Sequence, residues 1–325
     1  MTISRRSALA GLAAAPLVHR AAQAQGAAFP SRPLTLVVPF PAGGPADIFG
    51  RYLAQGMTAN LKQQVVVENK SGAAGVTGMD YVAKASDAHV MGIYSASAGA
   101  IMQSLMEKMP YRPGIDLAPL ILLVRIQEVL VVNAKFGVST FAELMTKLKA
   151  NPGKFSYGSA GTGGITHLAT ELFKRETGTD ILHVPYRGAA PATNDLVADT
   201  VQIALLDIPV LLPHIRSGAL KALAISSDTR AALLPDVPTM RELGYPKVNS
   251  DNWYGLGSPG AALRKDRERL HDAATAALKS KELIDAYAAV GGIVGGGSSE
   301  EFATFQRLEV QKWAEVIKAA NVKLE

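Results

Sequence analysis

The amino-acid sequence predicts an α/β protein built from two lobes. Its 325 residues, 48% of them hydrophobic, are enough to form one large core or two moderate ones. Apolar segments of strand length alternate with amphipathic helical segments, which is typical of parallel sheets covered by helices. A unit made of an apolar strand, a glycine-rich loop and a helix occurs twice, once near the N-terminus and once in the middle of the chain.

The first unit begins with residues 34–38, a Leu-Thr-Leu-Val-Val run between two prolines that predicts a buried strand. From Asp47 to Leu61 the apolar residues recur at helical spacing. The loop between strand and helix contains Gly43 and Gly44, which let the backbone approach a ligand closely. The N-terminus of the following helix would suit an anion. The alternative is a tight strand-to-helix connection without a ligand.

Further strands are expected over 64–69 and 90–95, with helices reaching Lys84 and starting near Ala96. This βαβαβ run places its strand ends at one edge, where ligands collect in open α/β sheets. Residues 120–132 predict two strands separated near 125–128, at a crossing between the lobes.

The second unit follows a capping box at Thr140 and Glu143 that starts a helix ending before residues 151–153. It consists of a strand over 155–159, a glycine-rich loop over 158–164 and a helix over 166–177. Later segments predict strands over 181–184, 201–206 and 221–226, helices over 192–198, 262–279, 282–289 and 299–320, a short helix ending at Gly244, and a return to the first lobe over 253–256.

The first 24 residues have the pattern of an export signal. Arg5 and Arg6 precede an 11-residue apolar run, 8–18, which is too short to span a bilayer, and Ala22-Gln23-Ala24 resembles a cleavage site. The arginine pair favours the twin-arginine route, and the general secretory route stays open. Cleavage would lower the net charge from +5 to +2, because three arginines and no acidic residue are lost. We expect a soluble periplasmic protein.

Several function classes lack their motifs. Lys and Arg are scattered, which argues against nucleic-acid binding. Neither glycine loop has the spacing of a nucleotide motif, and no metal-binding spacing occurs, so no cofactor or metal is expected. Ser97 and Ser159 lack the glycine that a nucleophile elbow has two residues before its serine. We therefore predict a binding protein and not an enzyme, with an exported serine hydrolase as the weaker alternative.

Five segments together resemble the Bug-type substrate-binding proteins of tripartite tricarboxylate transporters: residues 38–47, 66–70, 157–161, 183–188 and 234–239. The resemblance covers essentially the whole chain after residue 24. It implies a type II periplasmic-binding-protein fold, a hinge of crossing segments, and a carboxylate held between the lobes mainly by main-chain N–H groups. A membrane permease would be the partner. Ala46 stands where the family often has Ser or Thr.

The lobes are predicted over 25–126 together with 253–325, and over 127–252, in a monomer. The candidate ligand-binding residues are Phe40, Ala42, Gly43, Gly44, Asp47, Ser97, Ser159, Gly161, Thr162, Gly163, Tyr186, Arg187 and Asp207.

Most of these side chains have a structural alternative. The hydroxyls of Ser159 and Thr162 can donate to a carboxylate or cap their own loop. Asp47 can cap its helix, or accept a hydrogen bond from a ligand hydroxyl or ammonium group.

The remaining candidates are similarly ambiguous. Arg187 can hold a carboxylate with two hydrogen bonds or form a surface salt bridge. Tyr186 is either a pocket wall or core packing, and Asp207 is either a hydrogen-bonded structural group or a determinant of ligand chemistry. His167 is expected to be a packed or capping histidine and not a ligand-binding group. Besides delivery to a permease, the same binding event could serve a signalling partner.

Overall fold

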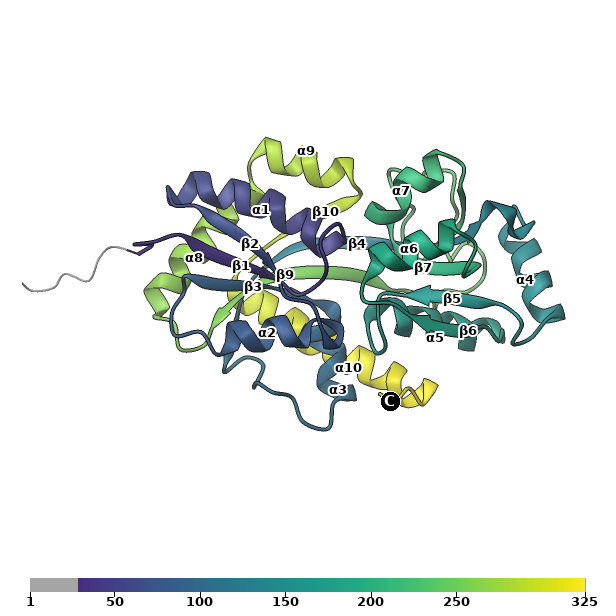
Figure 1. Cartoon of the computed structure of the whole chain (residues 1–325), viewed down its shortest axis with the longest axis horizontal. Coiled ribbons are helices and arrows are strands. Elements are labelled where there is room, and N and C mark those ends of the chain that lie inside the picture. Colours follow the sequence, from purple (N-terminus) through teal and green to yellow (C-terminus); the bar gives the residue numbers. More distant parts are fainter. Residues whose placement is uncertain (1–28, 325) are drawn as a thin grey trace, which may run out of the picture.

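The computed structural model describes residues 29–324 and shows two α/β lobes side by side (Figure 1). The predicted export signal lies outside these residues. Ten strands of the described chain form one continuous hydrogen-bonded system, with the order β2-β1-β3-β9-β4-β7-β5-β6 and with β8 and β10 paired to β4. Lobe 1 and lobe 2 are defined here by the strands of this sheet that each contains.

Lobe 1 contains the parallel strands β2, β1 and β3, followed by β9 and the first part of β4 in antiparallel pairing. Its strands are β1 (Leu34–Val38), β2 (Val65–Asn69), β3 (Val90–Ser95), β4 (Leu117–Asn133), β9 (Asp251–Pro259) and β10 (Gly292–Gly296). Its helices are α1 (Pro45–Leu61), α2 (Val76–Ala83), α3 (Met102–Leu105), α8 (Arg264–Leu278), α9 (Lys281–Ala289) and α10 (Ser299–Ala320), with the short turns η1 (Ala73–Gly75) and η2 (Ser97–Ile101, a π-helix).

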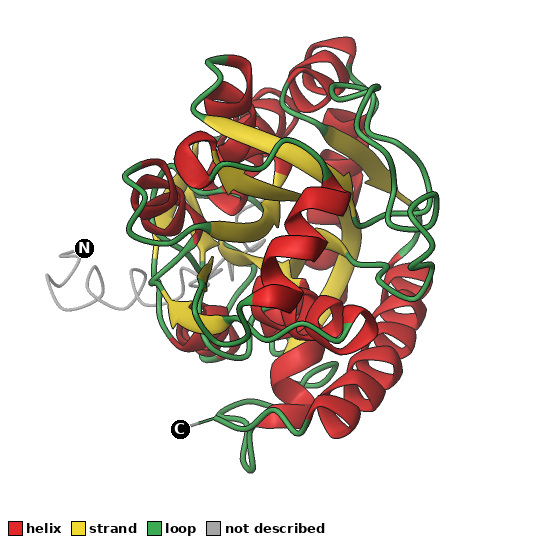
Figure 2. Cartoon of the chain, turned by 90° about the vertical axis from the view of Figure 1, so that its right-hand side faces the viewer, coloured by secondary structure: helices red, strands yellow, loops and turns green. Residues whose placement is uncertain are grey.

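Lobe 2 contains the parallel strands β6, β5 and β7, with the second part of β4 antiparallel to β7 and β8. Its remaining strands are β5 (Ser156–Ser159), β6 (Leu182–Pro185), β7 (Ile203–Asp207) and β8 (Leu220–Ile225). Its helices are α4 (Phe141–Ala150), α5 (Ile165–Thr177), α6 (Ala189–Val197) and α7 (Ile208–Arg216), with the short turn η3 (Ala134–Phe136). Figure 2 faces this lobe and shows helices on both sides of the strands.

Strand β4 passes from one lobe into the other without interruption. Gln127 is the last residue paired with β9, and Glu128 is the first residue paired with β7. The predicted break near 125–128 is therefore wrong. The polar residues there find partners within the sheet, because Arg125 binds Asp251 at 2.7 Å and the Gln127 amide donates to the Thr229 carbonyl.

Three further segments differ from the prediction. The short helix ending at Gly244 is absent from the described structure, where turns occupy 240–244 and the Met240 N–H donates to Ile225 of β8. Helix α7 was not predicted, since it contains Pro213. Strand β10 was also missed because its glycines read as a loop. They allow close packing, since a Cβ on Gly292 would lie 2.4 Å from Phe49.

Each lobe buries apolar side chains on both faces of its sheet. In lobe 1, Phe49 and Tyr287 belong to the cluster under α1, α8 and α9, and Trp253 and Trp313 to the cluster under α2 and α10. Helix α5 of lobe 2 adds Ile165, Leu168 and Leu172 to this second cluster. The lobes are thus packed together where α10 approaches α5, as Figure 1 shows.

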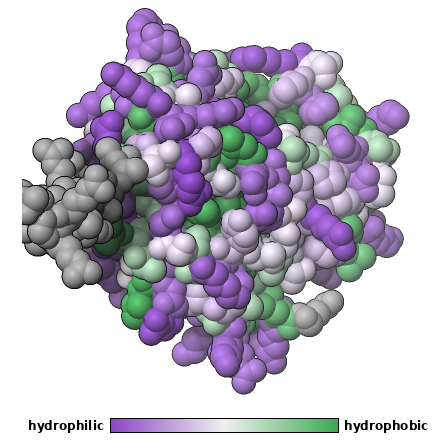
Figure 3. Space-filling model, turned by 60° about the vertical axis from the view of Figure 1, so that its left-hand side comes forward, coloured by the Kyte–Doolittle hydropathy of each residue, from purple (hydrophilic) through white to green (hydrophobic). Residues whose placement is uncertain are grey.

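The face shown in Figure 3 is mostly hydrophilic. On the face in Figure 3, hydrophobic residues lie in small separate areas among hydrophilic ones. Within residues 29–324, none of the helices has the length and apolar character needed to cross a membrane.

Candidate functional site between the lobes

Three helices begin at one cavity between the lobes. Helix α1 comes from lobe 1, and α5 and α6 come from lobe 2. Their N-cap residues, Gly44, Gly164 and Gly188, line this inner cavity and provide no side-chain cap. The positive dipole ends of these first turns are therefore directed to a shared space, which is an arrangement that binds anions. Two first residues offer no free N–H there, because Pro45 of α1 has none and the Ile165 N–H of α5 donates to Ser97.

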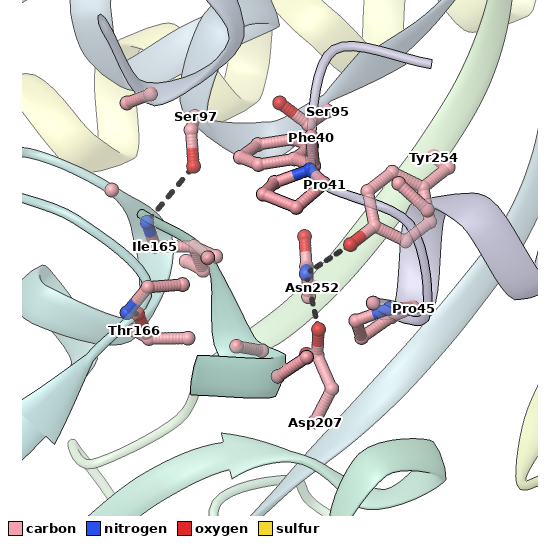
Figure 4. Close-up of a pocket in the computed structure, with 18 residues that line it drawn as sticks. Phe40, Pro41, Pro45, Ser95, Ser97, Ile165, Thr166, Asp207, Asn252 and Tyr254 are labelled. Carbon is pink, nitrogen blue, oxygen red and sulfur yellow. Dashed lines mark hydrogen bonds between the residues drawn. The ribbon is translucent and has the colours of Figure 1, made fainter. Parts of the chain in front are cut away.

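A hydrogen bond crosses the cavity between the lobes. The main-chain N–H of Ile165, in α5, donates to the hydroxyl oxygen of Ser97, the first residue of η2, over 3.0 Å (Figure 4). Both residues line the cavity. Close contacts nearby show the same approach, since a Cβ on Gly188 would lie 3.0 Å from Pro41 of lobe 1. The lobes are closed on each other.

The floor of the inner cavity is polar and is built from two strands. Asp207 ends β7, and Asn252 and Tyr254 lie on β9, two residues apart and therefore on one face. The Asn252 amide donates to Asp207 Oδ2 at 2.8 Å and to the Tyr254 hydroxyl at 3.2 Å (Figure 4). Asp207 Oδ1 is buried and has no partner among the described residues.

The pKa of Asp207 is raised to about 7, chiefly by burial and further by the nearby charge of Asp251, against the lowering effect of the Asn252 hydrogen bond. Glu128 of β4 stands opposite Asp207 in register and is fully buried. Burial and repulsion by Asp207 raise the pKa of Glu128 well above its ordinary value, although the Ser250 hydroxyl donates to its Oε2 at 2.5 Å. Two buried acids thus lie at the crossing between the lobes.

An outer groove continues from the inner cavity toward solvent. Its volume is about 640 Å³, and the two spaces share Phe40, Pro41, Ala74 and Ala160. Gly161, Thr162, Tyr186 and Arg187 line the groove. The Tyr186 hydroxyl donates to Asp195 at 2.7 Å, which leaves its ring as a wall. Arg187 is exposed and forms no salt bridge with a described residue.

Five predicted site residues line neither space. Ala42 and Gly43 are exposed. The buried carboxylate of Asp47 accepts hydrogen bonds from the Gly43 N–H, Arg51 and Asn69. These contacts match the structural alternative for this residue. Ser159 is fully buried, and Gly163 packs near Leu105 and Leu324. Phe40, Gly44, Ser97 and Asp207 line the inner cavity, and Gly161, Thr162, Tyr186 and Arg187 line the outer groove.

The fully buried Ser159 and the partly buried His183 form a pair that bears on the hydrolase alternative. The Ser159 Oγ and His183 Nε2 atoms lie 2.6 Å apart, and the His183 ring stacks on His167 at 3.9 Å. Burial, aided by the two neighbouring basic groups His167 and Lys174, lowers the pKa of His183 to about 3. A weak base beside an inaccessible hydroxyl is poorly suited to nucleophilic catalysis. His167 accepts a hydrogen bond from the Gly163 N–H, in line with its predicted packing role.

Sequence reasoning missed several cavity residues. Gly188, Ala189 and Ala190 precede or begin α6, and the Gly-Ala-Ala-Pro run after a strand was a usable signal of a third helix N-terminus. Asn252 and Tyr254 carry only the alternation of a strand as a signal. Their position in the site depends on the pairing of β9 with β4.

The chain matches known proteins along most of its length. Residues 49–322 match the family model of the tripartite tricarboxylate transporter family receptor. Protein BugT of Bordetella pertussis is 38% identical over 299 residues, which are 91% of this chain and 92% of BugT. The structure of the periplasmic binding protein BugD is 32% identical, has a TM-score of 0.87, and is matched over 91% of this chain and 100% of BugD.

A structure of an R. palustris protein with adipate is 30% identical and has a TM-score of 0.88, with 91% of this chain and 99% of that protein covered. These matches confirm the predicted two-lobed periplasmic-binding-protein fold.

Proposed function

This chain belongs to the receptor family of tripartite tricarboxylate transporters, and we propose that it captures a small carboxylate between its lobes. The observation that carries the proposal is the convergence of three helix N-termini, from both lobes, on one cavity. The structural relative with adipate supports the same class of ligand.

The physical reason for two lobes lies in the strength of the contacts. A hydrogen bond to a charged group contributes about 1.5–3 kcal/mol, whereas association costs roughly 4–15 kcal/mol, so one open loop would bind weakly. Closure adds donors from the second lobe and excludes water. Micromolar affinity corresponds to about −8 kcal/mol, which contacts from both lobes can supply.

The closed inner cavity has a volume of about 30 Å³, room for about two water molecules. A ligand must therefore enter while the lobes stand apart. One carboxylate would bind at the helix N-termini, and the rest of the molecule would extend toward Thr162, Tyr186 and Arg187 in the outer groove.

A thermal-shift panel tests the ligand class. It contains acetate, succinate, malate, adipate, citrate, glutamate and benzoate, with glucose as a control that has no carboxylate. We expect at least one carboxylate to raise the melting temperature, because a ligand that binds only the folded state stabilises it. Isothermal titration calorimetry then measures its affinity. A panel in which no carboxylate binds would overturn the proposed function.

The finer role in transport is also proposed. The protein would be exported to the periplasm through the signal at residues 1–24 and act there as a monomer. It would hinge between 25–126 with 253–325 and 127–252, and the closed form would be recognised by a membrane permease. Uptake of the labelled ligand by cells with and without the gene tests delivery. If uptake is unchanged but the ligand-loaded protein binds a sensor kinase, the signalling alternative is favoured.

A further inference from the structure

We propose that the Asp207 carboxyl is protonated in the closed protein and donates this proton in a hydrogen bond to the bound carboxylate, so that ligand capture takes up a proton. The inference rests on the proposed function and adds a specificity-determining contact and a pH dependence to it. It follows from the position of Asp207, its neighbours and its unused oxygen atom.

Asp207 is the acidic residue of the inner cavity, whose described lining contains no Lys, Arg or His. An anionic ligand would therefore meet helix N-termini and one carboxyl group, with no side-chain cation to offset a second negative charge. Two carboxylates sharing such a site are not both ionised at low cost. A proton on Asp207 removes the repulsion and changes the group from an acceptor into a donor.

The unpartnered atom indicates where the proton would lie. Oδ2 of Asp207 accepts the hydrogen bond from Asn252, whereas Oδ1 is buried without a partner in the described structure. Asp207 is 2% exposed, so solvent does not satisfy this oxygen. A proton on Oδ1 needs an acceptor, and a carboxylate oxygen of the ligand in the cavity would provide one.

The charged groups around Asp207 affect its pKa directly or through Glu128. Asp251 on β9 disfavours its ionisation, although Arg125 pairs with Asp251 through a salt bridge of 2.7 Å. Glu128 on β4 stands opposite Asp207, and the Asp207 charge raises the pKa of Glu128, so Asp207 ionises first. Lys312 of α10 lowers the pKa of Glu128 through its positive charge.

Two neutral features also contribute. Tyr254 is buried beside Asp207, with the pKa of its hydroxyl raised, so it stays neutral, and its hydroxyl lowers the pKa of Asp207. The N-terminus of α7, which follows Asp207, favours the ionised form. Burial has the largest of these effects and raises the pKa of Asp207 to about 7.

The sign of the pH dependence follows from closure. In the open form Asp207 is more hydrated and ionises at lower pH. Closing over an anion raises its pKa, so the closed complex holds more protons than the free protein. Affinity should therefore fall as the pH rises through neutrality, with a slope of at most about one decade per pH unit for one proton.

Calorimetric titrations at pH 6.5 and 8.5 test this, with the tightest binder among succinate, malate and adipate. Simple carboxylates are largely ionised at both pH values. The wild-type Kd should be at least about fivefold higher at pH 8.5. At pH 7, buffers with different ionisation enthalpies should reveal uptake of a fraction of a proton per ligand.

The variant Asp207→Asn keeps the shape and can still donate a hydrogen bond, but it cannot ionise. It should bind with a Kd that changes less than about twofold between the two pH values. Glu128→Gln should keep the wild-type profile of affinity against pH, because Asp207 ionises before Glu128 and the Gln variant removes no charge while Asp207 titrates. Asp285→Asn, in an exposed α9 pair with Lys281, should keep the wild-type profile.

The outcomes separate the two proposals. Tight carboxylate binding without pH dependence or proton uptake overturns this inference and leaves the proposed function intact. A folded Asp207→Asn protein that loses binding, or keeps the wild-type pH slope, also overturns it. If that variant does not fold, the wild-type pH dependence and proton uptake decide, and their absence overturns the inference. Absence of binding by every carboxylate overturns the proposed function itself.

Discussion

The Ser97 hydroxyl oxygen and the Ile165 main-chain nitrogen lie 3.0 Å apart and join the start of η2 in lobe 1 to the start of α5 in lobe 2. Both residues are buried. This hydrogen bond exists only when the lobes are closed, so it contributes to the closed state and not to the folding of either lobe alone. It connects the geometry of the cavity with the equilibrium between open and closed forms.

Removing this contact should weaken ligand binding without unfolding the protein. For Ser97→Ala we expect a Kd about three- to tenfold higher, because a net hydrogen bond contributes about 0.5–1.5 kcal/mol. Calorimetry measures the affinity, and small-angle scattering should show a larger open fraction. Ser104→Ala, at an exposed position on α3, is the control. An unchanged Kd in Ser97→Ala would show that this bond does not influence closure.

A methyl group at Gly188 should obstruct closure. Its Cβ would lie 3.0 Å from Pro41 of the other lobe, and its φ of +129° disfavours a side chain. We expect Gly188→Ala to raise the Kd about tenfold, since such overpacking costs about 1–3 kcal/mol.

Gly218→Ala is a matched control for Gly188→Ala. Gly218 also has positive φ, +78°, but nothing lies within 4 Å of its Cβ position. Equal affinity loss in both variants would attribute the effect to backbone strain and contradict the steric explanation.

Arg187 should distinguish dicarboxylates from monocarboxylates. It is exposed in the outer groove, where a second carboxylate of a bound molecule would lie. Arg187→Ala should weaken dicarboxylate binding about three- to tenfold, by the loss of one charge-assisted contact, and leave monocarboxylate binding nearly unchanged. Calorimetry at low and high salt measures this, with the exposed Arg216→Ala as control. Equal loss for both ligand classes would contradict this placement.

Glu128 should make the protein less stable as the pH rises. Burial and the nearby Asp207 raise its pKa in the folded state, so the unfolded chain ionises first and gains stability relative to the folded chain. The free energy of unfolding should fall between pH 5 and pH 8 by up to about 1.4 kcal/mol per pH unit for each such group.

The variant Glu128→Gln isolates this contribution. It keeps an acceptor for the Ser250 hydroxyl and should show a smaller loss of stability between the two pH values. Urea unfolding at pH 5 and pH 8 measures the difference. A variant with the same pH dependence as wild type would show that Glu128 does not ionise over this range.

The local units of the site could be predicted from the sequence because their signals are local. Gly44 and Gly161 occur in loops between an apolar strand and a helix, and both lie at the inner cavity or outer groove. The continuous course of β4 could not be read in the same way. Its polar residues Arg125 and Gln127 look like a break until their partners, Asp251 and Thr229, are known.

The sequence by itself determined the alternation of strands and helices, the two glycine loops and the family resemblance, since these depend on residue type and spacing. Tertiary structure alone decided that Asp207, Asn252 and Tyr254 form the cavity floor, because that requires β7 and β9 to pair with β4 from distant positions in the chain. It also decided that Gly188 brings a third helix N-terminus to the site and that Asp47 turns away to Gly43 and Asn69. Strand register and lobe closure are non-local, and they select which of many polar residues share one space.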